Sequence, residues 1–477
     1  MDIKIKKGQT IELPVDSLAF GGRGVARING YVIFIDGGLP GQEVKVKIVR
    51  KKKDFAEARV LEILQQSSEV VEARCQHFGV CGGCRFQNLD YEAQKKYKTQ
   101  QIVESLEHIG GFRNPHVEAV KPSPDLFYYR NKMEYSFGRQ RWLTSEELNL
   151  PKLKKPKDFA LGLHIRGRFD RILDLDTCHL QSEDSVPLLN FIRNFAKQSV
   201  FLPYSTKDHT GFWRHLVFRE GKNTADFMVN VVTSESEDNY VILDELADEL
   251  RKRFAFITTV VHNINRRKAQ IAVGDEERVL FGPGMIREII GHCTFQISAN
   301  SFFQTNTKGA ALLYETVVRF ADFQGDELVY DLYSGAGTIS LFISNRVKKV
   351  IGFEIVENAV DDAKKNRALN HVENCEFVAG DLRETLDLES MAGENLAKPD
   401  VVIIDPPRAG MHADVLRQVL KLHPRKIIYV SCNPTTFARD AKSLCGSHYQ
   451  LKYVQPVDMF PMTAHIELVS LFETVIK

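Results

Sequence analysis

The last third of the chain alternates short apolar runs with amphipathic stretches, and this pattern constrains the fold more than any other feature. Strands are expected at residues 328–333, 349–354, 375–379, 401–404, 426–431 and 465–472, with helical stretches such as 358–369 and 413–422 between several of them. Strands that alternate with helices indicate βα units and a mainly parallel sheet. We therefore predict an α/β fold whose C-terminal domain is doubly wound and Rossmann-like.

Three of these strands end in residues that can carry chemistry. Residues 328–333 run into Ser334-Gly-Ala-Gly337, residues 401–404 into Asp405-Pro-Pro-Arg408, and residues 426–431 into Cys432-Asn-Pro434. In an open α/β sheet the carboxyl ends of the strands share one crevice, where ligands bind. We expect a cofactor turn, a recognition carboxylate and a nucleophilic thiol to meet there.

The glycine turn predicts a nucleoside cofactor. Asp331-Leu-Tyr-Ser-Gly-Ala-Gly337 is not a complete G-x-G-x-x-G, which argues against a nicotinamide cofactor. Glu354 ends the next strand, where an acid accepts hydrogen bonds from ribose hydroxyls, and Asp381 follows the third strand, where it can contact a base edge. The series favours S-adenosylmethionine, and for each acid the alternative is a helix N-cap.

The N-terminal residues 8–65 form a separate β-rich unit in this interpretation. Short strands are expected at 10–13, 24–28, 31–35, 43–49 and 56–63, and Asn29-Gly30 marks a hairpin. Five short strands suit an OB-like barrel that binds nucleic acid, and a generic β module is the alternative. The net charge of +1 is uninformative, but residues 45–59 carry seven Lys or Arg against two acids.

Three cysteines lie within ten residues: Cys75, Cys81 and Cys84. Cys178 is the best candidate for a fourth ligand because it lies in the same middle region. Four thiolates suit either tetrahedral zinc or an iron–sulfur cluster, and incidental burial is the alternative. Apart from Cys432, the remaining cysteines are isolated in the sequence and are expected to be ordinary packing residues: Cys293, Cys375 and Cys445.

The remaining segments add less. Residues 91–109 are expected to be helical, and residues 125–290 a mixed, largely antiparallel α+β domain, with the lysine-rich tract 145–157 as an exposed loop. The N-terminus lacks the apolar core of a signal peptide, and no apolar stretch is long enough to span a membrane. We expect a cytoplasmic protein with no membrane partner.

Together these motifs resemble the bacterial RNA uracil-C5 methyltransferase family. Within it, the chain is most similar to the 23S rRNA branch with an N-terminal TRAM domain and a [4Fe-4S] cluster. The resemblance spans nearly the whole chain and rests on the cysteines above and on six further motifs: Tyr129-Arg-Asn-Lys132, Ser301-Phe-Phe-Gln304-Thr-Asn306, Asp331 to Gly337, Asp405-Pro-Pro-Arg408, Ser431-Cys432-Asn433-Pro434 and His465-Ile-Glu467.

The resemblance implies a domain division and a set of ligands. Residues 1–66 would be the TRAM barrel, 67–90 with 125–290 the iron–sulfur domain, and 91–124 with 291–477 the catalytic domain. The four cysteines would hold a [4Fe-4S] cluster rather than zinc, and Phe302 would lie near the target base. The methyl-donor site would be lined by Gln304, Tyr333, Glu354, Asp381 and Asp405. The tract 145–157 and Thr338, where some relatives carry Asn, depart from the family pattern.

Methylation of uracil C5 requires a nucleophile and a base, because C5 reacts only after activation. The Cys432 thiolate would add to C6, and Glu467 would remove the C5 proton. Asp405 would accept the uracil N3–H, and Arg408 or Arg439 would assist the thiol. The alternatives are that Cys432 is a buried structural thiol, that Glu467 is an exposed charge on a strand, and that Asp405 only caps the following helix.

The leading prediction is therefore an enzyme that methylates a uridine of 23S rRNA, with RNA as the only implied partner and no protein partner. The second prediction is a tRNA uracil-C5 methyltransferase, a branch that generally lacks the barrel and the cluster. The third, from another class, is a non-catalytic RNA-binding protein with a metal-stabilised fold.

Overall fold

The C-terminal part of the chain folds into one seven-stranded sheet. The computed structural model of the protein describes residues 5–168, 170–236, 240–386 and 397–475. The sheet order is β18-β17-β16-β19-β20-β22-β21, parallel except that β22 runs antiparallel to both of its neighbours. Its strands are β16 (Leu328–Leu332), β17 (Lys349–Glu354), β18 (Cys375–Ala379), β19 (Val401–Ile404), β20 (Lys426–Ser431), β21 (Tyr449–Val457) and β22 (Glu467–Thr474).

The parallel strands are the ones that the sequence predicts, and β21 lies outside the predicted set. Strands β16, β19 and β20 are buried on both faces and are nearly all apolar, as expected when helices cover a parallel sheet, whereas the edge strand β18 is partly exposed. Strand β21 contains Pro456, which is compatible with its place at the edge of the sheet but weakens the strand signal.

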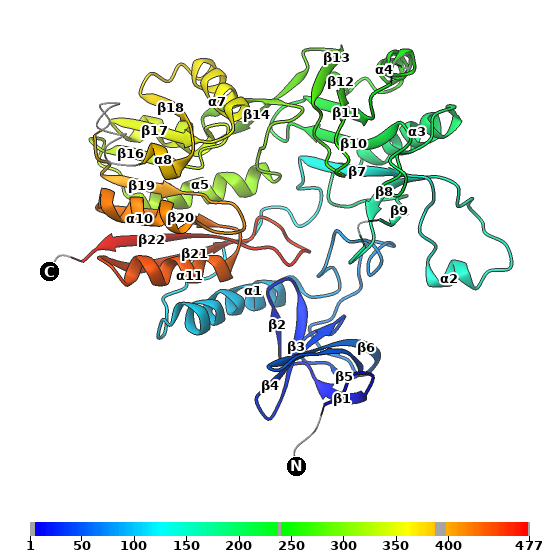
Figure 1. Cartoon of the computed structure of the whole chain (residues 1–477), viewed down its shortest axis with the longest axis horizontal. Helices are drawn as coiled ribbons and strands as arrows, with labels where there is room; N and C mark the ends of the chain where they lie inside the picture. The colour runs from blue at the N-terminus through cyan, green and yellow to red at the C-terminus, as the bar shows by residue number, and fades with distance from the viewer. Residues whose placement is uncertain (1–4, 169, 237–239, 387–396, 476–477) are drawn as a thin grey trace.

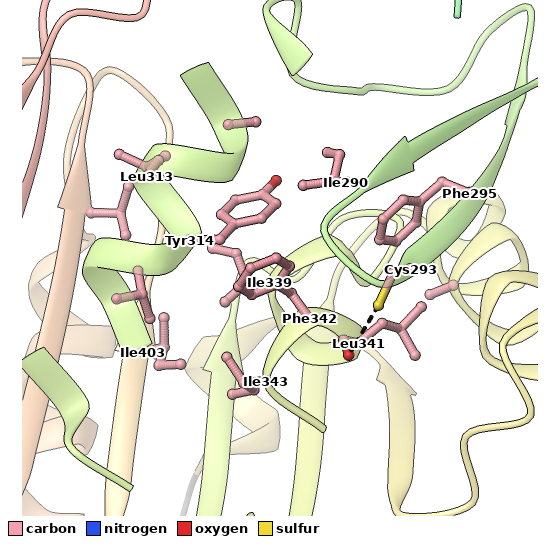
Figure 2. Close-up of a cluster of buried hydrophobic side chains, with 14 of the residues drawn as sticks. Ile290, Cys293, Phe295, Leu313, Tyr314, Ile339, Leu341, Phe342, Ile343 and Ile403 are labelled. Carbon is pink, nitrogen blue, oxygen red and sulfur yellow. Dashed lines mark hydrogen bonds between the residues drawn. The ribbon is translucent and has the colours of Figure 1, made fainter. Parts of the chain in front are cut away.

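Helices cover both faces of this sheet, so the doubly wound prediction is confirmed (Figure 1). One core lies beneath α5, α6 and α7, where Figure 2 shows Tyr314 beside Phe342 and the Cys293 thiol directed at the Leu341 carbonyl, 3.4 Å away. The other core lies beneath α10 and α11. The helices are α5 (Thr307–Ala321), α6 (Thr338–Ile343), α7 (Glu357–Leu369), α8 (Leu382–Thr385), α10 (Ala413–Leu422) and α11 (Pro434–Cys445), with a 3-10 turn, η2 (Ser344–Arg346).

The N-terminal unit is a six-stranded sheet in the order β1-β5-β6-β4-β3-β2, drawn in blue in Figure 1. Its apolar core is made of buried residues such as Ile33, Val46 and Ala58. The three-residue β2 was too short to be predicted. The strands are β1 (Thr10–Pro14), β2 (Ser17–Ala19), β3 (Arg23–Ile28), β4 (Tyr31–Asp36), β5 (Glu43–Lys51) and β6 (Phe55–Gln65).

The middle of the chain forms a second seven-stranded sheet, in the order β13-β12-β11-β10-β7-β8-β9. It is antiparallel except for the β11–β12 pair, which agrees with the predicted mixed domain. Helices α3 (Ser185–Gln198) and α4 (Val241–Arg253) accompany it. The strands are β7 (Lys132–Gly138), β8 (Ala160–His164), β9 (Ile172–Asp174), β10 (Trp213–Glu220), β11 (Phe227–Thr233), β12 (Thr259–Ile264) and β13 (Glu276–Phe281).

Two details of this middle region differ from the sequence expectations. The tract 145–157 projects as a long loop, as predicted, but it begins with a short capped helix, α2 (Ser145–Leu148). The hairpin of β14 (Met285–Ile290) and β15 (Cys293–Ser298) packs into the C-terminal core, so the predicted boundary at residue 290 falls inside one structural element.

The segment 91–124 lies against the C-terminal sheet although the middle domain separates them in sequence. Helix α1 (Tyr91–Ser105) and the π-helical turn η1 (Leu106–Gly110) contact α11, and α1 lies between α11 and the barrel in Figure 1. Val117 and Lys121 then form parallel bridges with β21 at Val454 and Val457. No helix in the described ranges has the length and apolar character needed to cross a membrane.

Candidate functional site

A pocket opens where β16 turns into α6. Tyr333, Gly335 and Gly337 all have positive φ angles, of 64°, 53° and 76°, so the backbone turns sharply and leaves room for a ligand. The pocket is lined by Phe302, Phe303, Gln304, Asp331, Tyr333, Ser334, Gly335, Ala336, Thr338, Ile339 and Asp405. The glycine turn and the Asp405 strand end therefore meet, as predicted.

Three of the five predicted donor-site residues line this pocket, and they are Gln304, Tyr333 and Asp405. Gln304 comes from the segment before α5, and the Asn131 side chain of the middle domain donates to its carbonyl oxygen at 2.9 Å. The two domains therefore fix this wall of the pocket together. Phe302 is 72% exposed, so an aromatic face remains open at the pocket.

Glu354 and Asp381 lie at the ends of neighbouring strands. The Glu354 carboxylate accepts hydrogen bonds from the backbone amides of Gly335 (3.0 Å) and Val356 (2.9 Å), so it braces the glycine turn from the side. Asp381 caps α8 and forms an ion pair with Arg383, and this pair lowers the pKa of Asp381 to about 2. Asp381 does not line the pocket.

Asp331 is a pocket residue to which the sequence assigned no role. Its carboxylate accepts from the backbone amide and the hydroxyl of Ser340, while its second oxygen is buried without a partner among the described residues. Burial raises the pKa of Asp331 to about 7. Its position just before the glycine turn was the one feature of the sequence that could have marked Asp331 as a pocket residue.

Cys432 follows β20 directly and stands at the start of α11. The Asn433 side chain accepts from Thr435 N at 3.1 Å, which caps α11, and donates to the Arg408 carbonyl at 2.9 Å. Cys432 is partly exposed, and burial together with the nearby Glu467 carboxylate raises the pKa of its thiol to about 11.

Glu467 is the first residue of β22, next to β20. The antiparallel ladder ends where Ser431 pairs with Leu468, so Cys432 and Glu467 are the residues directly beyond that last pair. Burial, followed by the Asp405 carboxylate, raises the pKa of Glu467 well above its usual value, and the Arg408 guanidinium opposes that shift. The predicted nucleophile and base therefore lie close together.

Asp405 and Arg408 connect this pair with the pocket. Burial raises the pKa of Asp405 to about 6, and its charge acts on both Cys432 and Glu467. The Arg408 guanidinium opposes the rise in the pKa of Cys432. Arg439 instead binds the Asp440 carboxylate and the carbonyls of Ala409 and Met411. Of the two predicted arginines, Arg408 is the one that acts on the thiol.

The four predicted cysteine ligands line a second, largely apolar pocket in the middle domain. Cys75, Cys81, Cys84 and Cys178 all belong to its lining, together with Phe78, Leu163, Leu175 and Leu180. Burial raises the pKa of Cys81 to about 11 and that of Cys84 to about 12, and the charges of the other cysteines add to both shifts. Among the described residues no group of three or more His, Cys, Asp or Glu side chains is close enough to hold a metal ion, so the cluster stays a prediction.

Comparison with known proteins places the chain in a family. Residues 244–475 match the tRNA (uracil-5-)-methyltransferase family and residues 4–61 match the TRAM domain. An uncharacterised RNA methyltransferase of Chlorobaculum tepidum is 41% identical over 99% of this chain and 98% of its own length. Another, from Bacteroides thetaiotaomicron, is 38% identical over 96% of this chain and all of its own length.

A solved structure is similar along nearly the whole chain. The tRNA (uracil-54, C5)-methyltransferase of Pyrococcus abyssi, in complex with S-adenosyl-L-homocysteine, has a TM-score of 0.74 and 29% identity over 97% of this chain and 100% of its own. The curated relatives, the two family matches and this fold agree with one another. The chain therefore belongs to the RNA uracil-C5 methyltransferase family and carries an N-terminal TRAM domain.

Proposed function

We propose that this protein transfers a methyl group from S-adenosylmethionine to C5 of a uridine in RNA through a covalent bond between Cys432 and the uracil ring. The observation that carries the proposal is the position of Cys432 next to Glu467 at the ends of β20 and β22. Asp405 is electrostatically coupled to both residues and also lines the glycine-turn pocket. Donor pocket, nucleophile and base thus adjoin one another.

In the proposed reaction the Cys432 sulfur bonds to C6, and the electrons of the C5–C6 double bond move toward C5 and the O4 carbonyl. S-adenosylmethionine supplies an electrophilic methyl group, which C5 takes. Glu467 then accepts the C5 proton, the double bond re-forms, and the Cys432–C6 bond breaks. Burial raises the pKa of the thiol to about 11 even though the Arg408 guanidinium opposes that rise, so we propose Arg408 as the group that favours the thiolate.

Asp405 is the proposed recognition group for uracil. A carboxylate accepts the uracil N3–H, whereas the unprotonated N3 of cytosine is itself an acceptor. With a pKa of about 6, Asp405 is mainly ionised at neutral pH and available for this bond. Its alternative role as a helix cap finds no support, because His412 caps α10 and Asn433 caps α11.

The donor-site roles follow from where each residue lies. Gln304 and Tyr333 line the pocket. Glu354 keeps lone pairs for ribose hydroxyls after it binds two backbone amides. For Asp381 to contact the adenine edge, it must share or exchange its ion pair with Arg383.

The proposed ligand of the four-cysteine pocket is a [4Fe-4S] cluster. Four cysteines that line one apolar pocket suit such a cluster, which would link Cys178 to the segment 75–84. Protein purified without oxygen is expected to be brown, with broad absorption near ~400 nm and bound iron and sulfide. Colourless protein with one zinc per chain would contradict this proposal.

The proposed substrate is 23S rRNA, because the TRAM domain and the four-cysteine pocket are both features of the rRNA branch that the chain resembles. tRNA is the second candidate, since the Pyrococcus abyssi structure is that of a tRNA methyltransferase and covers 97% of this chain. The overall architecture therefore does not separate the two substrates. Mass spectrometry of nucleosides from rRNA and from tRNA, in wild-type and deletion cells, would identify the RNA that loses 5-methyluridine.

RNA containing 5-fluorouridine tests the chemistry directly. Fluorine cannot be removed as a proton, so the enzyme should stop as a covalent complex with the RNA that survives denaturing electrophoresis. Cys432→Ala should form none, while Cys445→Ala, at the far end of α11, should form it normally. A wild-type protein that forms no adduct, or an adduct that persists in Cys432→Ala, would refute the mechanism.

A further inference from the structure

The segment 458–466 leads from β21 into β22 and delivers Glu467 to the site. We call it the base loop. It has no regular structure, yet most of it is buried, including Asp458, Met459 and Ile466. Its path fixes where β22 begins, and therefore where the Glu467 carboxylate lies.

The first support of the base loop comes from the residues that follow Cys84. We call residues 75–89 the cysteine segment. The backbone amides of Arg85 and Phe86, which come directly after Cys84, both donate to the Met462 carbonyl, at 2.7 and 2.9 Å. Met462 has a positive φ of 65°, a conformation that non-glycine residues adopt only when their surroundings hold them there. The cysteine segment thus holds the base loop at its most constrained residue.

The second support is the side chain of Gln94 on α1, which is fully buried. Its Oε1 accepts from Met462 N at 3.0 Å, and its Nε2 donates to the carbonyls of Phe86 (3.0 Å) and Leu89 (2.8 Å). One amide therefore joins the base loop to the cysteine segment. Buried groups that lose their hydrogen-bond partner are costly, so this amide specifies a single arrangement of the two segments.

We propose that Gln94 is a positioning residue for Glu467 and that it couples the position of this carboxylate to the cysteine segment. The inference rests on the proposed role of Glu467 as the base. Cys432 is delivered from β20 and α11, so loss of the Gln94 bonds should leave addition to C6 intact. Removal of the C5 proton should slow instead, and the methylated RNA should stay bonded to Cys432.

The test compares Gln94→Met with Gln101→Met in the full-length protein. Gln101 lies on the same helix and is also buried, but its side-chain amide has no hydrogen-bond partner among the described residues. With ordinary uridine RNA, Gln94→Met should release product about a hundredfold more slowly and accumulate covalent complex. With 5-fluorouridine RNA it should form the adduct at the wild-type rate. Gln101→Met should match the wild type in both assays.

A second variant guards against a folding defect. Gln94→Glu keeps an acceptor for Met462 N but loses both donations to the cysteine segment, and it should show the same shift toward trapped complex. The ratio of trapped to released RNA counts only molecules that have reacted, so partial unfolding does not change it. The inference is overturned if both Gln94 variants release product normally, or if adduct formation falls in parallel with turnover. A wild type that never forms an adduct would instead refute the proposed function.

Discussion

Cys432 and Glu467 lie directly beyond the Ser431–Leu468 pair, which ends the β20–β22 ladder. Residues opposite each other in an antiparallel pair have Cα atoms about 4.5–5.5 Å apart. Two side chains at that spacing reach adjacent atoms of one small ring. The end of the β20–β22 ladder therefore brings the proposed nucleophile and base together, and the buried base loop holds Glu467 at the start of β22.

The first prediction concerns the base. Glu467→Gln removes proton acceptance while it keeps the shape of the side chain, so turnover should fall about 10²–10⁴-fold. The methylated RNA should remain bonded to Cys432 and appear as a slow-migrating band on a denaturing gel with ordinary uridine RNA. Glu473→Gln, near the other end of the same strand, serves as the control and should turn over normally.

The second prediction concerns pH and base selection. Because the pKa of Asp405 is about 6, the fraction of protonated Asp405 grows as the pH falls through 6, and the acceptor for uracil N3–H is lost. Activity should therefore decline on the acid side of neutrality. Asp405→Asn should lose about 10–100-fold at pH 7.5, as expected for a bond to a charged group, and its remaining activity should not show the acid decline centred near pH 6. An unchanged acid limb in Asp405→Asn would assign that limb to another group.

The third prediction separates two glycines of the donor turn. A Cβ at Gly337 would lie 2.6 Å from the Phe377 ring, whereas a Cβ at Gly335 would meet nothing within 4 Å. Gly337→Ala should therefore lower the melting temperature clearly more than Gly335→Ala. Since Gly335 lines the pocket, Gly335→Ala should mainly weaken binding of S-adenosylhomocysteine, which calorimetry measures. Equal destabilisation by both variants would contradict the steric argument.

The fourth prediction concerns a buried ion pair that anchors α1. The Lys98 ammonium donates to the Asp458 carboxylate at 2.7 Å, and both side chains are inaccessible to solvent. Lys98→Met leaves a buried carboxylate without its cation and should cost about 3–5 kcal/mol in urea unfolding. The double variant Lys98→Met/Asp458→Leu should recover much of that loss. If the double variant is as unstable as the single one, the unpaired charge is not the cause.

The sequence predicted those parts of the fold and site that depend on local patterns. The parallel strands are continuous apolar runs, and Asp405 and Cys432 follow their strands directly, so their meeting at one edge of the sheet followed from topology. Strand β21 was missed because an edge strand with Pro456 gives a weak pattern. The pairing of Asp381 with Arg383 depends on side-chain conformation rather than on spacing.

Individual side-chain contacts between distant segments could not be predicted from the sequence, for a physical reason. Gln94 and Met462 are 368 positions apart, and neither helix period nor strand alternation marks a buried amide that will bond a distant backbone. The role of Asp331 was hidden in a similar way, since a strand-end acid looks the same whether it caps a helix or lines a pocket.

The docking of α1 on the C-terminal domain has a consequence for synthesis on the ribosome. Lys98 and Asp458 are 360 positions apart, so at about 5–20 residues per second the helix leaves the ribosome roughly 20–70 s before its partner is made. During that interval its buried face, with Gln94, Lys98 and Ile102, has nowhere to pack. Until Asp458 and the base loop are made, the buried face of α1 in a nascent chain is therefore open to chaperones and proteases.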